Sequence, residues 1–332
     1  MDVQAMNPTP VGVVGLGLMG SSIVVALLAA GHRVVALAPI ADEKEKASRH
    51  LADLLRHADE AGMLPQGIAA CIERLQLVED YQLLADCRVV MECVIEDKQI
   101  KKAVYQRIAE SVRPDVVIAS NTSAIPISEL QELVQHPKRF LGVHWAEPAY
   151  MTRFLEVTCG KDTDPAVGQY MLSLGETWGK EPTLILKDIR GFITNRLMYA
   201  IYREALTLVE QGHTTLADAD KAFRYDAGSW VTVMGIFERM AIHGGVDYLN
   251  VLKRIFPQLS NREDVPDVMQ RLVEQGAKGI HNLRGLYPYT ESLARHWEAT
   301  FAQFNKDIYG LAAKYNVKDA VEAEGANISQ ET

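Results

Sequence analysis

Residues 11–31 read VGVVGLGLMGSSIVVALLAAG, and this stretch decides the fold. An apolar run at 11–14 leads into a glycine-rich turn, a helical segment and a second apolar run at 34–37. The turn consists of Gly15, Leu16, Gly17, Leu18, Met19 and Gly20. In such a turn the first glycine permits a tight bend, the second lets backbone approach a pyrophosphate, and the third lets the helix pack close to the strand. The order strand, glycine turn, helix, strand therefore predicts a dinucleotide-binding unit, with phosphates at the helix N-terminus.

Alternating apolar and helical patterns continue through the first half of the chain. Strands are predicted at 11–14, 33–37, 88–93, 116–120 and 140–144. Helices are predicted between them at 42–62, 66–75, 97–112 and 126–135. This alternation indicates a doubly wound, mostly parallel sheet with crossover helices. The highly charged segment 42–62 is expected to project from the sheet as an exposed helical arm.

Strand patterns stop after about residue 183, and the rest of the chain has helical periodicity. Residues 191–212 predict one long, mostly buried helix that ends at Gly212. Further helices are predicted at 215–224, 230–240, 246–256, 263–276 and 289–315. The predicted fold class is therefore α/β. It comprises a Rossmann-type domain over residues 1–187, an all-helical domain over 188–317 and a flexible tail over 318–332.

Composition excludes several classes of partner. The 332 residues carry a net charge of −9 and contain no run of five Lys or Arg, which argues against nucleic acid and membranes as partners. No apolar run approaches the roughly 18 residues of a membrane span, and the N-terminus lacks the pattern of a signal peptide. The four cysteines are widely separated and have no metal-ligand spacing, so we expect reduced thiols, no metal site and a cytoplasmic protein.

Several polar side chains are candidates for chemistry. Ser123 and His144 come just past the ends of predicted strands, where open α/β sheets bind their ligands. Glu156 lies on the next extended segment, and a chain that turns at Pro148 would bring it beside the imidazole. A carboxylate there would fix the tautomer of the ring and stabilise its charged form. Asn195 opens the long helix and would place an amide nearby, but each of these residues also fits a purely structural role.

Four short motifs, together with the glycine turn, resemble the 3-hydroxyacyl-CoA dehydrogenase family in its short single-chain form. The motifs are SNTS at 120–123, HWAEP at 144–148, FLEV at 154–157 and GFITNR at 191–196. The similarity spans about residues 11–290. The resemblance implies NAD-linked oxidation of a secondary alcohol β to a carbonyl, or the reverse reaction. It also implies a small-molecule substrate and a homodimer that associates through the helical domain.

The resemblance assigns roles to single residues. His144 would be the general base and Glu156 its partner, while Ser123 and Asn195 would hydrogen-bond the reacting oxygen or the neighbouring carbonyl. The residues expected at the cofactor are Gly15, Leu16, Gly17, Leu18, Met19, Gly20, Ala38, Cys93, Glu96, Lys101 and Asn121. Among them, Glu96 and Lys101 match positions that line the nicotinamide in the family, although a simple ion pair at the start of a helix would also explain these two residues.

One departure from the family pattern concerns the substrate. Glu147 stands where the family has the asparagine of an H-x-x-N-P motif. An amide can donate to a substrate carbonyl, whereas an ionised carboxylate only accepts. Glu147 therefore favours a substrate with extra hydroxyls or a cationic group, for which Trp145 would add a cation–π face; a local ion pair with Arg153 is the other interpretation. We expect a free hydroxy acid or a polar relative, with a short acyl-CoA or a carnitine-like or aromatic alcohol as the alternatives.

A second departure concerns the cofactor. Selection of NAD usually rests on an acidic residue about 20 residues past the fingerprint. This chain has Ala38 at that position, and Asp42 or Glu43 would have to substitute from the following loop. Basic residues that would suit a 2′-phosphate lie close by, and these are Lys44, Lys46 and Arg49. NAD is favoured, with NADP as the alternative.

Two other classes of function are weighed against this one. A related branch of β-hydroxyacid dehydrogenases uses a lysine on the interdomain helix, and the Asn195-Arg196 pair disfavours it here. A non-catalytic dinucleotide-binding protein would bind cofactor without turnover, and the joint presence of the four site residues disfavours that as well.

The apolar segment 228–256 is expected to be buried in part against another subunit.

Overall fold

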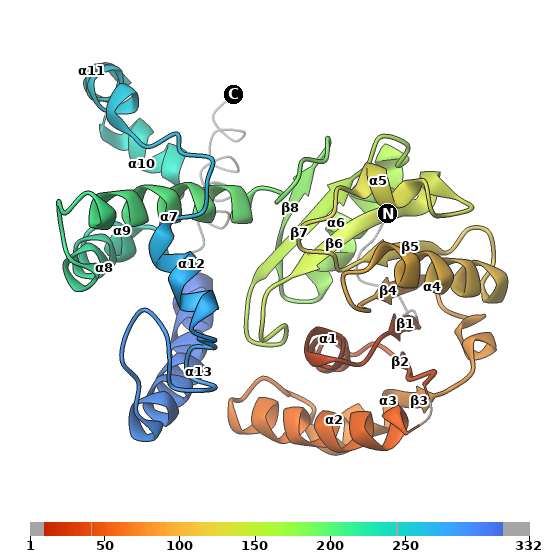
Figure 1. Ribbon diagram of the computed structural model, residues 1–332. Coiled ribbons are helices and arrows are strands. Elements are labelled where there is room, and N and C mark those ends of the chain that lie inside the picture. Colours follow the sequence, from red (N-terminus) through yellow and green to blue (C-terminus); the bar gives the residue numbers. More distant parts are fainter. Residues whose placement is uncertain (1–9, 41, 244, 315–332) are drawn as a thin grey trace, which may run out of the picture. The chain divides into compact units, whose positions relative to one another are not determined.

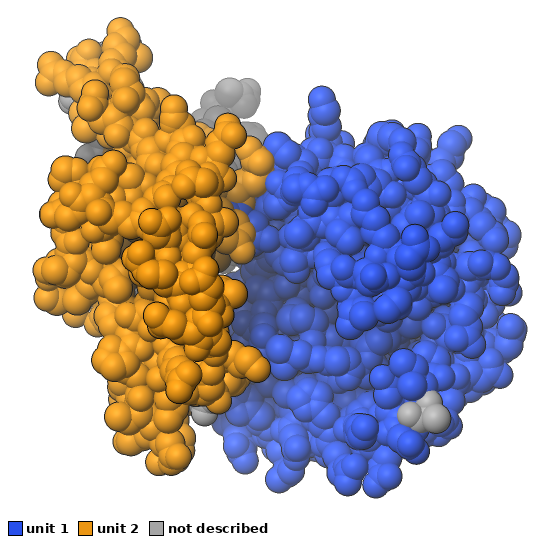
Figure 2. Space-filling model, viewed as in Figure 1, with its two compact units in different colours: residues 1–195 blue, residues 196–332 orange. Residues whose placement is uncertain are grey.

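The computed structural model describes residues 10–40, 42–243 and 245–314 (Figure 1). The chain divides into two compact units, residues 1–195 and 196–332 (Figure 2). The first unit is α/β and the second is helical, so the predicted fold class is confirmed. The tail predicted at 318–332 lies outside the described residues.

Unit 1 is built on one eight-stranded sheet with the strand order β3-β2-β1-β4-β5-β6-β7-β8. Its strands are β1 (Val11–Val14), β2 (Val34–Leu37), β3 (Leu75–Val78), β4 (Val89–Glu92), β5 (Val117–Ser120), β6 (Phe140–Trp145), β7 (Phe154–Cys159) and β8 (Glu181–Ile185). All neighbours pair in parallel except β6 and β7, which are antiparallel. Because β1 lies between β2 and β4, the strand order reverses there, and ligands of such sheets bind beyond the carboxyl ends of these strands.

Helices cover both faces of the sheet. One face carries α1 (Leu18–Ala29), α2 (Glu43–Glu60), α3 (Gly67–Arg74) and α6 (Pro165–Thr177), and the other carries α4 (Lys98–Ser111) and α5 (Ile127–Gln131). Every residue of β1, β2, β4 and β5 is buried between these layers. This burial on both faces explains why the strands read as nearly uninterrupted apolar runs.

Three of these strands and α-helices of unit 1 are not indicated by the sequence pattern. Both edge strands, β3 and β8, are among them: β3 follows α3 without a break, and β8 contains Pro182 and is only partly buried. Edge strands lack the continuous apolar run of a central strand, which removes the signal. The third is α6, although Asp164 caps this helix and Pro165 occupies its first turn.

The helical arm expected at 42–62 is wrong, because α2 packs beside α1 (Figure 1). Ala47, Leu51, Leu55 and Ala58 form a buried stripe along α2, and the last three share a core cluster with α1. The charged residues occupy the opposite face of an ordinary amphipathic helix. Their number conceals the narrow apolar stripe in the sequence.

Unit 2 contains most of α7 (Thr194–Glu210) and the α-helices that follow it in the described part of the chain. These are α8 (Leu216–Tyr225), α9 (Ala227–Trp230), α10 (Ile236–His243), α11 (Gly245–Ile255), α12 (Asp267–Glu274) and α13 (Glu291–Lys314). The expected burial of α7 is wrong, since none of its residues is buried in the single chain. Its apolar stripe, which includes Leu197 and Ile201, is exposed. Among the described residues, no helix has the length and apolarity needed to cross a bilayer.

Candidate active site

Strands β6 and β7 bring His144 and Glu156 together. The two residues are directly opposite each other in the antiparallel pair, so their side chains emerge on the same face of the sheet. Nδ1 of His144 lies 3.0 Å from Oε2 of Glu156. The contact expected from a chain that turns near Pro148 is therefore present.

Glu156 is held by four hydrogen-bond donors. Its side chain is 1% exposed, and its Oε1 accepts from the backbone N–H groups of Ile193 (3.1 Å) and Thr194 (2.9 Å) and from the Thr194 hydroxyl (3.1 Å). Burial alone would raise the pKa of Glu156, but the hydrogen bonds from His144 and Thr194 outweigh it, and the pKa is lowered. An ionised carboxylate only accepts, so Nδ1 of His144 carries a proton and Nε2 is the acceptor of the neutral ring.

The segment that leads into α7 completes this arrangement. Gly191 and Phe192 both have positive φ, at 81° and 50°, and the turn they form directs the next two backbone N–H groups to Glu156. The ring of Phe192 is buried and lies 5.8 Å from the imidazole of His144, while Phe154 contacts the imidazole edge-on at 5.4 Å. These aromatic contacts restrict the plane of the imidazole.

Ser123 and Asn195 lie beside each other. Nδ2 of Asn195 donates to the backbone carbonyl of Ser123 at 2.9 Å. Ser123 is exposed in the loop after β5, where the hydroxyl of Thr122 accepts from the N–H of Ile125 at 3.0 Å and fixes the turn. Because Asn195 directly follows the residue that holds Glu156, the start of α7 connects all four residues proposed from the sequence.

Trp145 lies on the other face of β6, so the expected cation–π contact between Trp145 and a substrate is wrong. Successive residues of a strand point to opposite faces, and Trp145 points into the core when His144 points to the site. Its ring is 2% exposed and stacks on Trp178 at 5.2 Å, and the ammonium of Lys180 lies 5.3 Å from the ring centre. The cation that Trp145 meets is therefore part of the protein.

The loop that carries Glu147 is fixed to two helices beside the glycine turn. The N–H of Ala149 donates to the hydroxyl of Ser22 on α1 at 2.7 Å. The hydroxyl of Tyr150 hydrogen-bonds Nδ1 of His57 on α2 at 2.8 Å. Burial, with the nearby charge of Glu147, raises the pKa of Tyr150 to about 12, so this hydroxyl stays protonated. Glu147 is thus an exposed carboxylate on an anchored loop.

The same loop rests on a buried lysine that the sequence does not single out. Lys180, just before β8, donates to the backbone carbonyls of Ala149 and Thr152. Burial, together with the charge of Arg153, lowers the pKa of Lys180 to about 7. Arg153, considered above as a partner for Glu147, forms an ion pair with Glu181 at 3.3 Å.

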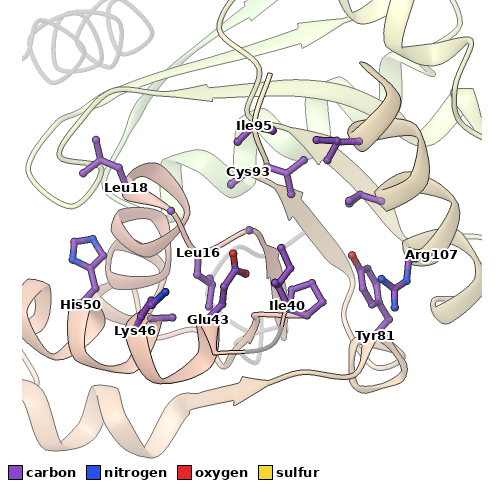
Figure 3. Close-up of a pocket in the computed structure, with 17 residues that line it drawn as sticks. Leu16, Leu18, Ile40, Glu43, Lys46, His50, Tyr81, Cys93, Ile95 and Arg107 are labelled. Carbon is purple, nitrogen blue, oxygen red and sulfur yellow. The ribbon is translucent and has the colours of Figure 1, made fainter. Parts of the chain in front are cut away.

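The glycine turn opens into a pocket of about 630 Å³ at the carboxyl ends of β1 and β4 (Figure 3). Gly15 has a φ of 93°, and a Cβ there would meet the backbone carbonyl of Cys93 at 2.9 Å. A Cβ at Gly20 would lie 1.8 Å from the carbonyl oxygen of Gly15, whereas a Cβ at Gly17 would meet nothing within 4 Å. These are the environments of a tight bend, a close helix contact and a backbone open to a pyrophosphate, so the pocket fits a dinucleotide.

Five of the residues expected at the cofactor line this pocket: Gly15, Leu16, Gly17, Leu18 and Cys93. Met19 and Gly20 lie in the first turn of α1. Ala38 is 1% exposed and offers no carboxylate. Apolar walls suitable for an adenine ring come from Ile40, Ile95, Ile100 and Val104.

A buried charge network supports the loop beside the glycine turn. Glu92, at the end of β4, is fully buried. Its carboxylate accepts four hydrogen bonds, from Lys101 Nζ (2.7 Å), the N–H of Val94 (2.8 Å), the Tyr105 hydroxyl (2.7 Å) and the Ser120 hydroxyl (2.7 Å). Sequence reasoning singles out Lys101 but misses Glu92 as its partner, although an acid that ends an apolar strand, followed by Lys101 and Tyr105 at helical spacing, is a usable signal.

Glu96 and Asn121 extend this support towards the site. Glu96 accepts from the hydroxyl of Thr122 and, at 3.2 Å, from the N–H of Ser123. Oδ1 of Asn121 accepts from the N–H of Trp145 at 3.1 Å. Lys101 is 1% exposed and pairs with Glu96 at 3.2 Å, so its ammonium lies inside the protein against Glu96 and, contrary to the expectation from the sequence, does not line the pocket.

Comparison with known proteins assigns both parts of the chain to one family. Residues 10–189 match the 3-hydroxyacyl-CoA dehydrogenase NAD binding domain, and residues 191–289 match the 3-hydroxyacyl-CoA dehydrogenase C-terminal domain. The 5-formyl-3-hydroxy-2-methylpyridine 4-carboxylate 5-dehydrogenase of Mesorhizobium japonicum is 31% identical over 296 residues, which make up 88% of this chain and 94% of the relative. An L-carnitine dehydrogenase of Pseudomonas aeruginosa is 32% identical over 232 residues, or 70% of this chain and 71% of the relative.

A solved structure extends the similarity to the fold. The crystal structure of a 5-formyl-3-hydroxy-2-methylpyridine 4-carboxylic acid 5-dehydrogenase, described as an NAD+-dependent dismutase, has a TM-score of 0.84 at 28% identity. The match covers 92% of this chain and 98% of that one. The chain therefore belongs to the 3-hydroxyacyl-CoA dehydrogenase family, a family of NAD-dependent oxidoreductases that act on CH–OH groups.

Proposed function

We propose that the protein transfers a hydride between NAD and the CH–OH group of a small polar substrate, with His144 as the general base. The His144–Glu156 pair carries this proposal, because four donors keep the carboxylate ionised and the carboxylate keeps the proton on Nδ1. Nε2 makes no hydrogen bond to any described residue, and the side chain is 13% exposed. The acceptor of the ring is thus left for a substrate proton.

His144 and Glu156 have different roles in the proposed reaction. In the oxidative direction Nε2 of His144 takes the proton of the substrate hydroxyl. Glu156 stabilises the imidazolium that forms but takes no proton, since its oxygens are already occupied by donors. NAD, when bound, supplies the hydride acceptor in oxidation and the hydride donor in reduction. In the reductive direction His144 returns the proton to the oxygen of the new alcohol.

Ser123 and Asn195 orient the reacting oxygen in this proposal. Their mutual hydrogen bond fixes the loop after β5 against the start of α7. Ile193 and Thr194, at the same start of α7, supply three of the four donors to Glu156, so the base and the oxygen-binding groups share one support. Shared support of this kind keeps reacting groups within the narrow distances that catalysis needs.

Glu147 supports a substrate other than a CoA thioester. It is exposed and sits on the anchored loop directly after the strand that carries His144. A carboxylate accepts hydrogen bonds from hydroxyls or attracts a cation, and it cannot donate to a carbonyl. Among the relatives, one is named for a pyridine carboxylate and another for carnitine, and these match 88% and 70% of this chain, whereas a relative named for 3-hydroxybutyryl-CoA matches 60% of it. A carnitine-like cation is the second candidate, because the same carboxylate would attract it.

A substrate screen tests this assignment. NADH formation or consumption is measured with hydroxy acids, carnitine, aromatic alcohols and acetoacetyl-CoA. We expect turnover of a small polar compound and poor turnover of acetoacetyl-CoA, and the variant Glu147→Asn should shift the balance towards the thioester. Efficient reduction of acetoacetyl-CoA by the unchanged protein would contradict the proposed substrate class.

We further propose a cytoplasmic homodimer that associates through unit 2. Large apolar side chains of the segment 228–256 are exposed in the single chain, among them Phe237 (84%), Ile242 (65%) and Phe256 (62%). Exposed apolar area of this kind is typical of a subunit interface. The four cysteines are free, which fits a reducing compartment. Light scattering on the purified protein should give twice the chain mass of 36.9 kDa, and a monomer would contradict the proposed association.

A further inference from the structure

We infer that Glu43, at the start of α2, recognises the adenosine ribose of NAD in this chain and sets the preference for NAD over NADP. The inference depends on the cofactor pocket and not on the substrate or on the role of His144. It concerns a position outside the family's usual acidic residue at the end of β2.

The end of β2 offers no side chain that could hydrogen-bond a ribose hydroxyl. Ala38 occupies the position of the acid, is 1% exposed and donates its N–H to the carbonyl of Val78 at 2.9 Å. Pro39 has no backbone N–H and Ile40 has an apolar side chain, and both line the pocket. The usual carboxylate is therefore absent from this strand, and the pair of ribose hydroxyls needs another acceptor.

Glu43 is the only acidic residue among the described residues that line the pocket. Figure 3 shows its carboxylate directed into the pocket, on the side of Leu16 and Ile40. The side chain is half-buried and makes no hydrogen bond or ion pair with any described residue. An unpaired carboxylate beside the glycine turn is a ready acceptor for two adjacent hydroxyl groups.

The neighbouring charged residues do not compete for this role. Asp42 is exposed and does not line the pocket. Lys44 pairs with Glu79 at 3.3 Å, and Arg49 pairs with Glu45 at 3.6 Å. Of the charged residues that the sequence offers as cofactor-selecting groups in this segment, Asp42, Lys44 and Arg49 therefore do not face the pocket.

Lys46 lies one helical turn after Glu43 and also lines the pocket. Its ammonium suits a phosphate and would favour NADP. The other basic residues that line the pocket are His50 and Arg107, and the guanidinium of Arg107 lies over the ring of Tyr81, 4.3 Å from its centre. A 2′-phosphate on the ribose would, however, stand against the carboxylate of Glu43, and two negative groups at short range repel each other. The structure therefore favours the diol of NAD as long as this carboxylate is present.

Equilibrium binding without substrate tests the inference. The dissociation constants of NAD+ and NADP+ are measured by calorimetry for the unchanged protein, Glu43→Gln and the matched control Glu45→Gln. We expect the unchanged protein to prefer NAD+. Glu43→Gln should weaken NAD+ binding about tenfold or more, because a charge-assisted hydrogen bond is lost, and should not weaken NADP+ binding. Glu45→Gln should alter neither constant, since Glu45 is exposed and faces Arg49.

An analogue of NAD+ that lacks the 2′-hydroxyl of the adenosine ribose distinguishes direct contact from indirect effects. The unchanged protein should bind the analogue more weakly than NAD+, and Glu43→Gln should bind the two equally. Thermal unfolding checks that the variants fold, and Glu43→Ala replaces Glu43→Gln if the latter is unstable. Equal affinity of the unchanged protein for NAD+ and NADP+, or an identical analogue penalty in both proteins, would overturn the inference. Neither outcome depends on turnover, so the proposed role of His144 stands or falls separately.

Discussion

Glutamine in place of Glu156 separates the charge of this residue from its shape. In the structure Oε1 accepts from Ile193 and Thr194 while Oε2 accepts from Nδ1 of His144. Glutamine has a single acceptor oxygen, so it satisfies only one of these two sides. With its oxygen on the side of α7, its NH2 group faces Nδ1, which must then act as an acceptor. The ring proton moves to Nε2, and the base is lost.

The size of the effect follows from these contacts. We expect kcat of Glu156→Gln to fall by about 10²- to 10⁴-fold, the range that general base catalysis contributes. The free energy of unfolding should fall by about 1–3 kcal/mol, because a buried hydrogen bond to a charged group is lost. NAD+ affinity should be unchanged, since Glu156 does not line the cofactor pocket.

Steady-state kinetics and calorimetric NAD+ binding measure these quantities. Glu132→Gln is the matched control, because Glu132 is exposed and forms an ion pair with Lys161 at 3.3 Å, away from the site. The pKa of Glu156 is lowered in the fold, so its stabilising effect is present above the unfolded pKa of about 4.3 and is lost as pH falls through the folded value. The unfolding free energies of Glu156→Gln and the unchanged protein should therefore converge in acid. A folded Glu156→Gln with nearly unchanged kcat would refute the reasoning.

Four other substitutions, which test three predictions, probe the supports of the site. Glu92→Gln breaks the buried pair with Lys101 and should cost about 3–5 kcal/mol in urea unfolding; an unchanged midpoint would contradict this. Gly17→Ala should leave thermal stability intact but weaken NAD+ binding, because its Cβ meets no protein atom within 4 Å. Gly20→Ala should lower thermal stability, because its Cβ would meet the carbonyl of Gly15. A Gly17→Ala protein that is destabilised while Gly20→Ala is stable would contradict the proposed fit of the dinucleotide. Burial lowers the pKa of Lys180 to about 7 in the folded protein, whereas the unfolded pKa is about 10.4. The unchanged protein should therefore lose stability as pH falls from about 10.4 towards 7, and Lys180→Met should lack this pH dependence. Parallel curves of unfolding free energy against pH for the two proteins would contradict this prediction.

Much of the fold is readable from local patterns. The glycine turn, the central strands and most helices follow from apolar periodicity and from the special backbone demands of Gly15 and Gly20. The pairing of His144 with Glu156 is also accessible, because the two lie on strands that are adjacent in sequence and antiparallel in register. Local order is enough where partners are close in the chain.

The remaining features depend on contacts between residues that lie far apart in the sequence. Glu92 meets groups from β5 and α4, and Lys180 meets carbonyls about 30 residues earlier in the chain. The sequence allows Trp145 to contact a substrate, and only the alternation of side chains along β6 shows that Trp145 belongs to the core. The charged face of α2 similarly concealed its packing, yet this same helix presents Glu43 to the cofactor pocket.

The central claim is that the imidazole of His144 accepts the proton when hydride leaves the substrate. Single-turnover hydride transfer, with saturating NAD+ and a substrate that the unchanged protein oxidises, measures this step directly in His144→Gln. We expect the rate to fall by about 10²- to 10⁴-fold, with unchanged NAD+ affinity and partial recovery when imidazole is added. The control His136→Gln, at an exposed position, should be fully active. Hydride transfer by His144→Gln at the rate of the unchanged protein would contradict the account.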